Sequence, residues 1–183
     1  MDDLAAIERF SGLYDSYRNR VYAYSVSRAG RQLADEVVSE VFLVAWRRLD
    51  QLPDDPLPWL LVTARNVIGS EFRAAARQES LAAELSSWGS GVAPDIADEV
   101  SERQAVLRAL AALPDADREL LTLSAWHGLS PSDAATVVGC SAATYFVRLH
   151  RARRRLEKAM ADNPEPERRP AIASQQERQP RWT

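Results

Sequence analysis

The sequence predicts an all-α protein made of two small helical domains joined by a flexible linker. Three observations support this prediction. Apolar residues recur at the spacing of amphipathic helices from Leu4 to Arg77, and again from about Ala105 onward. A Gly/Ser/Pro cluster, SSWGSGVAP, separates the two helical stretches. No segment shows the sustained alternation that is typical of a β-strand.

The first stretch divides into three expected helices. The first runs from Leu4 through Tyr24 with one apolar face, as one long helix or as two. The second covers residues 33–49. The third begins at Pro58, which suits the first turn of a helix, and ends near Arg77. The apolar positions of the first two helices are Ile7, Phe10, Leu13, Tyr14, Tyr17, Val21, Tyr22, Tyr24, Leu33, Val37, Val41, Val44 and Ala45.

Residues 78–102 contain six acidic residues and no basic ones, and we expect them to form a flexible acidic linker. The domains are therefore expected at residues 1–77 and 103–161. Residues 162–183 are rich in Pro, Gln, Glu and Arg and are expected to form a disordered tail, in which Trp182 is a lone hydrophobic residue.

Charge is distributed unevenly along the chain. The 183 residues carry a formal net charge of −3, with 23 Lys and Arg against 26 Asp and Glu. Residues 142–161 nevertheless sum to +5, because six basic residues stand against Glu157 alone, and residues 78–102 sum to −6. A near-neutral total thus hides a strongly polarised chain.

The composition argues against several classes of protein. Cys140 is the only cysteine, so an intrachain disulfide cannot form, and with His127 and His150 as the only histidines a zinc site is disfavoured. No apolar run approaches the roughly 18 residues of a membrane-spanning helix. The N-terminus, MDDLAAIERF, lacks a signal-peptide pattern. We therefore expect a cytoplasmic protein without membrane insertion.

A helix-turn-helix is predicted from Pro131 onward. Ser130 and Ser141 are suited to cap the N-termini of its two helices, and Pro131 suits the first turn of the first one. Gly139 suits a positive-φ position between them. The second helix is expected to begin at about Ala142.

The second helix of this motif combines an apolar face with a basic one. Four residues at helical spacing are expected to face the core: Tyr145, Leu149, Ala152 and Leu156. Four arginines remain outside: Arg148, Arg151, Arg154 and Arg155. A row of guanidinium groups after such a turn suits contacts to phosphate and guanine in the major groove. The alternative is a solvated helix that only complements its own dipole, but the turn, the caps and the basic stripe together favour DNA binding.

Three stretches together resemble a known family. They are DEVVSEVFLVAW, PWLLVTARN and LSPSDAATVVGCSAATYFVRLHRARRRL. In this order, and across a linker of suitable length, they are similar to the extracytoplasmic-function (ECF) sigma factors, the two-domain group of the bacterial sigma-70 family. The resemblance covers residues 8–77 and 102–160. It implies a sigma region 2 domain in the first half and a sigma region 4 helix-turn-helix domain in the second.

The resemblance implies a surface for core RNA polymerase on the second helix. In the family, the N-terminal domain binds the clamp helices of the β′ subunit, and the polymerase is also contacted at its β flap. The implied contact residues are Glu36, Ser39, Glu40, Phe42 and Trp46. The first three interrupt the apolar face, and the two aromatic residues recur on its flank. Family members usually have Gln where Ser39 stands, and an ordinary solvated helix face is the alternative interpretation.

The family's reader of the minus-ten promoter element corresponds to the loop at residues 50–57 and the helix that follows. The implied contact residues are Asp54, Asp55, Trp59, Arg65, Asn66, Arg73 and Arg77. Strand opening requires a base held in a pocket and basic groups along the exposed strand. The loop has no aromatic residue, so base capture would depend on backbone groups and on Asp54 or Asp55. Trp59 is more readily explained as a core residue than as a stacking platform.

The family's reader of the minus-thirty-five element corresponds to the helix-turn-helix. The implied contact residues are Ser141, Ala143, Thr144, Phe146, Val147, Arg148, Arg151, Arg154 and Arg155. Family members commonly have Lys and Ser at the positions of Phe146 and Val147. Apolar side chains there can contact thymine methyl groups but cannot donate to phosphate or guanine. We favour an altered sequence preference. A contact with a regulator protein and a weaker reading of the element are the alternatives.

The sequence thus predicts a transcription initiation factor with no catalytic site, cofactor or metal. It would bind core RNA polymerase and promoter DNA, and an anti-sigma factor is a further candidate partner. The alternative is a helix-turn-helix regulator whose N-terminal helices dimerise or sense a ligand. An enzyme is disfavoured because no phosphate-binding loop or nucleophile constellation occurs. A carboxylate metal site at Asp35, Glu36 and Glu40 is disfavoured because no histidine is near.

Overall fold

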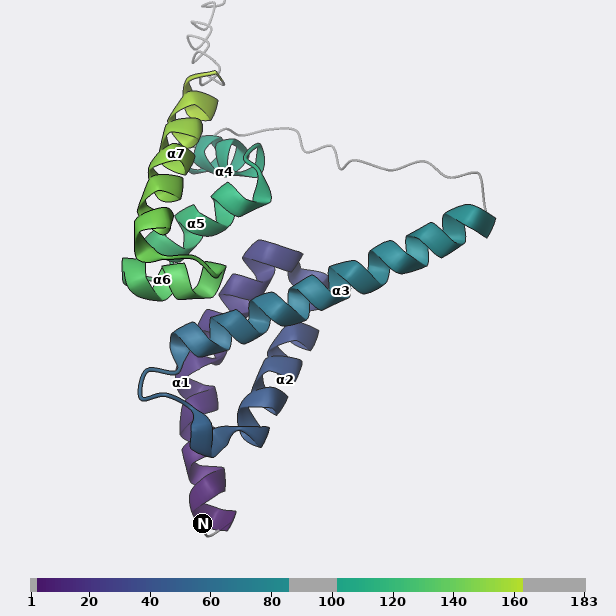
Figure 1. The fold of residues 1–183 in the computed structure, drawn as a ribbon, viewed down its shortest axis with the longest axis vertical. Helices are drawn as coiled ribbons and strands as arrows, with labels where there is room; N and C mark the ends of the chain where they lie inside the picture. Colours follow the sequence, from purple (N-terminus) through teal and green to yellow (C-terminus); the bar gives the residue numbers. More distant parts are fainter. Residues whose placement is uncertain (1–2, 86–101, 163–183) are drawn as a thin grey trace, which may run out of the picture.

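A computed structural model describes residues 3–85 and 102–162 of the protein. The α-helices in these ranges are α1 (Asp3–Ala29), α2 (Arg31–Arg47), α3 (Leu57–Leu85), α4 (Glu102–Ala111), α5 (Asp115–Ala125), α6 (Pro131–Val138) and α7 (Ala142–Ala161). A short 3-10 helix, η1 (Leu49–Gln51), follows α2. The described residues contain no strand, so the predicted all-α fold is confirmed for them. Figure 1 shows two groups of helices, α1–α3 and α4–α7, one above the other.

The first group, α1–α3, packs around an apolar core. α1 is one continuous helix, and the chain reverses into α2 at Gly30, whose φ of 79° lies in the left-handed region that favours glycine. The fully buried apolar side chains of this core are Val21, Tyr24, Ala34, Val37, Val41, Ala45, Leu60, Leu61 and Ala64. Of the positions that helical spacing predicted for this face, Val21, Tyr24, Val37, Val41 and Ala45 are fully buried. Ile7 is 51% exposed, because the N-terminal part of α1 extends beyond the core (Figure 1).

The third helix continues further than the sequence predicted. We expected it to end near Arg77, but α3 ends at Leu85, so residues 78–85 are helical rather than part of a linker. These residues, QESLAAEL, contain no Gly or Pro and are mostly strong helix formers, so no signal ends the helix earlier. The rest of the predicted linker, residues 86–101, and the predicted tail from residue 163 lie outside the described residues.

The second group, α4–α7, also buries apolar side chains, which belong to one hydrophobic cluster with those of the first group. Its most buried apolar side chains include Ala109, Leu120, Leu123, Ala134, Ala135, Val137, Tyr145 and Ala152. The hydroxyl of buried Tyr145 donates a hydrogen bond of 3.0 Å to the carbonyl of Leu120 and so ties α7 to α5. Tyr145, Leu149 and Ala152 face this core and Leu156 packs against it, as predicted.

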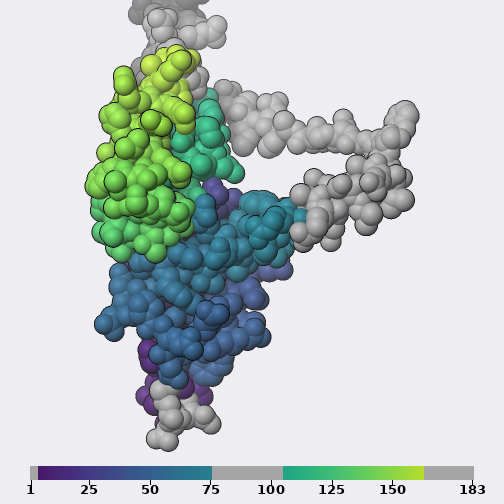
Figure 2. All heavy atoms as spheres, in the orientation of Figure 1, coloured from purple at the N-terminus to yellow at the C-terminus, as the bar shows by residue number. Residues whose placement is uncertain are grey.

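The two groups also contact each other. α5 packs against α1, and α6 packs against α3. Figure 2 shows the second group seated directly on the first, and Figure 1 shows the C-terminal part of α3 projecting away from both. The helix-turn-helix therefore lies against the first group of helices.

Replacing Gly139 with Ala should destabilise the second group. Gly139 ends α6 with φ 72° and ψ 42°, and an added Cβ would meet nothing within 4 Å, so the cost comes from the backbone alone. An L-residue in this conformation costs about 1–2 kcal/mol. Denaturant unfolding followed by circular dichroism measures the loss.

Gly12→Ala is the matched control. Gly12 lies inside α1, and an added Cβ there also meets nothing within 4 Å. Removing a glycine from a helix interior should raise the free energy of unfolding by about 0.5–1 kcal/mol. Equal changes of the same sign in both variants would contradict a left-handed turn at Gly139.

Candidate nucleic-acid interface

The helix-turn-helix is built from residue types that its backbone requires. The hydroxyl of Ser130 accepts a hydrogen bond of 3.1 Å from the Asp133 N–H and caps α6. The hydroxyl of Ser141 accepts one of 3.2 Å from the Thr144 N–H and caps α7. Gly139 between them has left-handed geometry. The predicted caps and turn are confirmed, and each cap contributes about 1 kcal/mol to helix stability.

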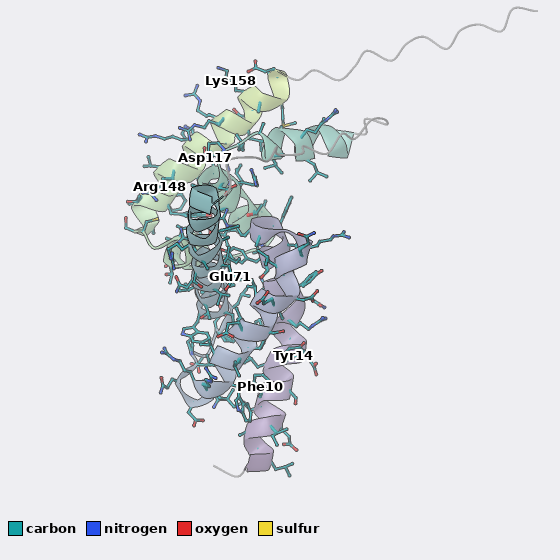
Figure 3. The ribbon with its side chains drawn as sticks, turned by 90° about the vertical axis from the view of Figure 1, so that its right-hand side faces the viewer. Phe10, Tyr14, Glu71, Asp117, Arg148 and Lys158 are labelled. Atoms are coloured by element: carbon teal, nitrogen blue, oxygen red, sulfur yellow. The ribbon has the colours of Figure 1, made fainter. Side chains whose placement is uncertain are left out.

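The outer face of α7 is basic, as predicted. Arg148, Arg151, Arg154 and Arg155 are all exposed. Arg155 pairs with the Asp117 carboxylate of α5, so part of its charge is neutralised within the second group. Arg148 and Asp117 line one cavity, and Figure 3 shows both where the two groups of helices meet. The other arginines of this row form no ion pair within the described ranges.

Phe146 and Val147 lie on the surface of α7. Their exposed fractions are 56% and 51%, which are high for large apolar residues. Ser141 and Ala143 are also exposed, while Thr144 is half-buried. The structure thus brings the residues predicted to contact the minus-thirty-five element together around the N-terminal half and outer face of α7.

A cavity of about 310 Å³ lies beside the loop that precedes α3. The loop and η1 contribute Leu49, Leu52, Pro53, Asp54 and Pro56 to its walls, and α1 contributes Arg9, Gly12, Leu13 and Tyr17. Asp54 therefore faces a cavity. Asp55 is used differently, because its carboxylate accepts a hydrogen bond of 3.3 Å from the Leu57 N–H at the start of α3.

Tyr17 is a candidate residue that the sequence analysis did not select. Its spacing in α1 predicts a core position, but the side chain is half-buried and lines the same cavity as Asp54. An unstacked base is held in a pocket by hydrogen bonds and by contact with aromatic or apolar side chains. No local pattern signals this role, because α1 and the loop are distant in sequence and meet only in the fold.

The remaining residues predicted to contact the minus-ten element lie along α3. Asn66 and Arg73 are exposed. Trp59 is half-buried and packs against the core, in agreement with its interpretation as a core residue. Arg77 belongs to α3, but its side chain lies outside the described ones. Arg65 differs from these residues because Glu119 of α5 forms an ion pair with it.

The Glu119 side chain is only 3% exposed. All partners of its carboxylate come from the first group of helices. The Tyr24 hydroxyl donates at 2.6 Å, Arg65 Nε donates at 3.0 Å, and Arg28 Nη2 lies 3.8 Å away. The burial of Glu119 does not follow from the sequence, because glutamate is usually an exposed residue and the charge partners that allow its burial are distant in sequence.

Two further hydrogen bonds hold the ends of α5 to α1. The Arg28 guanidinium donates to the Asp115 carbonyl at 3.2 Å, at the start of α5. The Arg20 guanidinium donates to the His127 carbonyl, just beyond the end of α5. Between them, Tyr24 packs edge-on against the His127 ring with 5.7 Å between centroids. α1 thus contacts the whole length of α5.

Burial at this contact shifts the pKa of two groups. Burial raises the pKa of the Tyr24 hydroxyl, and the neighbouring Glu119 carboxylate raises it further, so Tyr24 stays protonated and donates. Burial lowers the pKa of the His127 imidazole below its usual value, and the Arg20 guanidinium lowers it further. His127 is therefore neutral near pH 7. Its Nε2 atom is buried and has no hydrogen-bond partner among the described residues.

The predicted polymerase-binding face of α2 is polar and exposed. Glu36, Ser39 and Glu40 all lie on the surface, as predicted. The Ser39 hydroxyl donates to the carbonyl of Asp35 one turn earlier, at 2.9 Å. The Ser39 hydroxyl is thus engaged within α2, and Glu36 and Glu40 supply the charge on this face.

Phe42 does not lie on this exposed face. It is only 3% exposed, because it packs against Tyr14 and Phe10 of α1, with ring centroids 4.8 Å and 6.3 Å away. Trp46 remains 42% exposed and meets the Phe10 ring edge-on at 5.1 Å. Figure 3 shows Phe10 and Tyr14 on the N-terminal part of α1. Phe42 is thus buried against α1 and not exposed beside Trp46.

Within residues 3–85 and 102–162, no group of three or more His, Cys, Asp or Glu side chains could hold a metal ion. None of the helices in these ranges is long and apolar enough to cross a membrane. Cys140 is a free thiol and is half-buried. The features that stand out are thus the capped basic helix, the loop cavity and the polar face of α2.

Two helical units, one of them a capped helix-turn-helix with a basic outer face, define a two-domain DNA-binding protein. The family model for "Sigma-70 region 2" matches residues 13–78, and the one for "Sigma-70, region 4" matches residues 103–156. The ECF RNA polymerase sigma factor EcfG of Rhodopseudomonas palustris is 33% identical over 142 residues, which cover 73% of this chain and 75% of EcfG. The chain belongs to the ECF sigma factors of the sigma-70 family.

Other comparisons agree with this assignment. The ECF sigma factor SigL of Mycobacterium tuberculosis is 29% identical over 155 residues, 82% of this chain and 88% of SigL. The chain spans only 32% and 62% of the length of two further curated relatives that it matches. The sigma factor RpoE of Bartonella quintana, solved in complex with the anti-sigma factor NepR, has the same fold, with a TM-score of 0.66 and 23% identity over 85% of this chain and 98% of RpoE.

Acidification should destabilise the folded protein through His127. The pKa of His127 is lower in the folded protein than in the unfolded chain, so the unfolded chain binds more protons as the pH falls below about 6.5. Stability contributed by neutral His127 is therefore present above that pH and is lost as pH falls through the lowered pKa. Thermal unfolding at pH 7.5 and 5.5 measures the loss.

His127→Phe is the informative variant, because a ring of similar size can still pack against Tyr24 but cannot take up a proton. It should remove part of the pH dependence. His150→Gln is the control, since His150 is the only other histidine and is exposed. The same pH dependence in the wild type and in both variants would contradict a role for His127.

Proposed function

We propose that this protein is a transcription initiation factor that binds core RNA polymerase and directs it to particular promoters. The observation that carries the proposal is the capped helix-turn-helix, with its exposed row of arginines, in one chain with a region 2 domain. It acts in the cytoplasm, where its polymerase is. The alternative of a dimerising regulator is not favoured, because the first half of the chain matches Sigma-70 region 2.

α7 would read the minus-thirty-five element. Its exposed guanidinium groups can neutralise phosphates and release counterions, and Arg can donate two hydrogen bonds to guanine. Phe146 and Val147 are exposed at 56% and 51%, beside the N-terminus of α7 that would enter the major groove. Their apolar surface suits thymine methyl groups. This supports the altered sequence preference that we favour.

The loop cavity would hold a base of the minus-ten element. Its volume of about 310 Å³ suits a single base, and Asp54 and Tyr17 line it from opposite segments. Exposed Asn66 and Arg73 on α3 would follow the displaced strand. Opening would draw its free energy from these binding contacts, so the factor would need no catalytic site and no cofactor.

The exposed face of α2 would bind the β′ clamp helices of the polymerase. Glu36 and Glu40 supply charge, and Trp46 supplies a large aromatic surface at the edge of the face. Aromatic residues of this kind dominate binding energy in many interfaces. Phe42 would support this face from within by packing against Phe10 and Tyr14 of α1. The second domain would contact the β flap, and an anti-sigma factor could compete for either surface.

Purified protein should support promoter-specific transcription by core RNA polymerase on fragments of the genome that encodes it. The expected result is a set of discrete transcripts that require both the protein and core enzyme. Run-off transcription followed by sequencing of the RNA 5′ ends measures it. Absence of any core-dependent transcript would overturn the proposed function.

Asn66→Ala provides a control within the same assay. Asn66 is exposed, so its replacement should leave the fold and core binding intact while weakening strand opening. Permanganate reactivity of unpaired thymines reports opening, and co-migration with core enzyme reports binding. Equal loss of both would indicate a folding defect instead.

Phe146→Lys should change promoter preference. Replacing an exposed apolar side chain by an ammonium group removes the thymine contact and adds a donor for guanine or phosphate. A base contact of this kind is worth about 1–3 kcal/mol of discrimination. Selection of bound duplexes from a randomised library measures the preference.

Glu157→Gln is the matched control for this change. It also adds one unit of positive charge to α7, at an exposed position outside the predicted contact set. A general electrostatic gain should appear in both variants, whereas a new base preference should appear only in Phe146→Lys. Unchanged preference in Phe146→Lys would assign Phe146 to a protein contact.

A further inference from the structure

An apolar groove lies on the second group of helices. Its walls come from α4, α5 and α7, and Figure 1 shows α4 and α5 both beside α7. The groove has a volume of about 170 Å³. The apolar side chains that line it are Val106, Leu110, Leu121, Ala125, Trp126, Leu149 and Leu156. This α4–α5–α7 groove contains none of the residues proposed to contact promoter DNA.

Large apolar side chains in and beside this groove are exposed to solvent. Trp126 lines the groove and is 58% exposed, and Leu107, which follows Val106 in α4, is 45% exposed. Met160 is 41% exposed and lies one turn beyond Leu156 on the same face of α7. Apolar surface that clusters in this way is typical of a site that another segment or protein covers.

One charged side chain, Arg153, also lines the groove. It is exposed and forms no ion pair within residues 3–85 and 102–162. A guanidinium group of this kind can lie over the face of an indole ring, which attracts it through the ring quadrupole. The groove therefore suits a tryptophan side chain better than an aliphatic one.

The groove and the basic row lie on different faces of α7. Three residues of α7 line the groove: Leu149, Arg153 and Leu156. Three arginines of the basic row instead line the cavity that they share with Asp117: Arg148, Arg151 and Arg155. At 3.6 residues per turn, the centres of these two sets are about a third of a turn apart. A side chain in the groove would therefore leave the basic row free for DNA.

The chain itself supplies a tryptophan within reach of this groove. Trp182 is the only aromatic residue of the segment 163–183, and it lies 20 residues beyond Asp162. A flexible chain of this length spans about 22–27 Å on average. Arg153 lies about 14 Å before Asp162 along the helix axis. The indole can therefore return to the groove without any stretching of the chain.

Attachment to α7 makes even a weak contact effective. A segment joined through a short flexible chain has an effective concentration in the millimolar range. A contact with a Kd of about 1 mM between separate molecules would then be formed in about half of the protein. One tryptophan is a sufficient anchor for such a contact, because its ring supplies a large apolar area. Docking of this side chain requires no secondary structure in the rest of the segment.

Trp88 is the other tryptophan outside the described residues. It follows Leu85 by three residues, so it lies within about 11 Å of the end of α3. Figure 1 shows that end of α3 projecting away from both groups of helices. Trp182, which follows the helix that forms one wall of the groove, is therefore the better occupant.

We propose that the indole of Trp182 docks in the α4–α5–α7 groove, against Trp126 and Leu156 and beneath the guanidinium group of Arg153. Docking covers apolar surface of the second group that is otherwise exposed. A partner that binds this groove has to displace Trp182 first. This proposal goes beyond the proposed function and does not depend on it, because it concerns neither the DNA-contacting residues nor the polar face of α2.

Methyl NMR of the chain of residues 1–183 compares the wild type with Trp182→Ala. Loss of the indole should shift the methyl resonances of the leucines that line the groove, because an aromatic ring shifts the resonances of nuclei close to it. The methyl resonances of Val37 and Leu60, which are buried in the first group, should not move. Ile172→Ala is the matched control, because it removes an apolar side chain from the same segment and should leave the groove resonances unchanged.

A peptide of residues 174–183 provides a second measurement on the Trp182→Ala protein. Titration with this peptide should reverse the shifts with an apparent Kd on the order of 1 mM. The same peptide carrying Trp182→Ala should have no effect. Arg153→Gln in the protein should weaken binding of the peptide about two- to fivefold, because the cation is lost from above the ring.

Three results would overturn the proposal. Unchanged groove resonances in Trp182→Ala would show that the groove does not hold this indole. Groove shifts in Trp88→Ala, and none in Trp182→Ala, would assign the groove to the other tryptophan. A difference between wild type and Trp182→Ala that disappears on dilution would show that a second copy supplies the indole. The transcription assay is independent of these measurements, so its failure would refute the proposed function and leave the docking of Trp182 unaffected.

Discussion

One buried carboxylate lies at the centre of the polar contact between α5 and the first group of helices. Glu119 is 3% exposed and takes its partners, Tyr24, Arg65 and Arg28, from the opposite domain. A buried charge that loses its partners costs about 3–5 kcal/mol when it stays buried. If the domains separate, however, water solvates Glu119 and that cost does not arise. The contacts of Glu119 therefore favour one relative orientation of the domains, but they contribute only modestly to the free energy of that arrangement.

This physical property suits a protein that needs to change partners. Each group of helices buries apolar side chains of its own, and these belong to one hydrophobic cluster. The contact between α1 and α5 includes two hydrogen bonds to backbone carbonyls. Arg28 donates to the Asp115 carbonyl and Arg20 donates to the His127 carbonyl.

The surfaces proposed for function are made in two different ways. On α7, capping at Ser141 and burial of Tyr145 fix the rotation of the helix, so Phe146, Val147 and the arginines must point outward. At the loop before α3, the cavity needs α1 as its second wall, because Tyr17 lines it together with Asp54. The aromatic contacts of Phe42 with Phe10 and Tyr14 support the neighbouring face of α2 from within.

The sequence by itself determined the all-α fold, the helix-turn-helix with its caps and turn, the inward and outward faces of α7, and the exposure of Glu36, Ser39 and Glu40, because these follow from local spacing and local hydrogen bonds. It misplaced the end of α3, since helix formers continue to Leu85, and it assigned Phe42 to a surface that α1 covers. Only the tertiary structure decided the cavity shared by Tyr17 and Asp54 and the burial of Glu119. Both depend on contacts between segments distant in sequence, and no local pattern encodes which charges will meet.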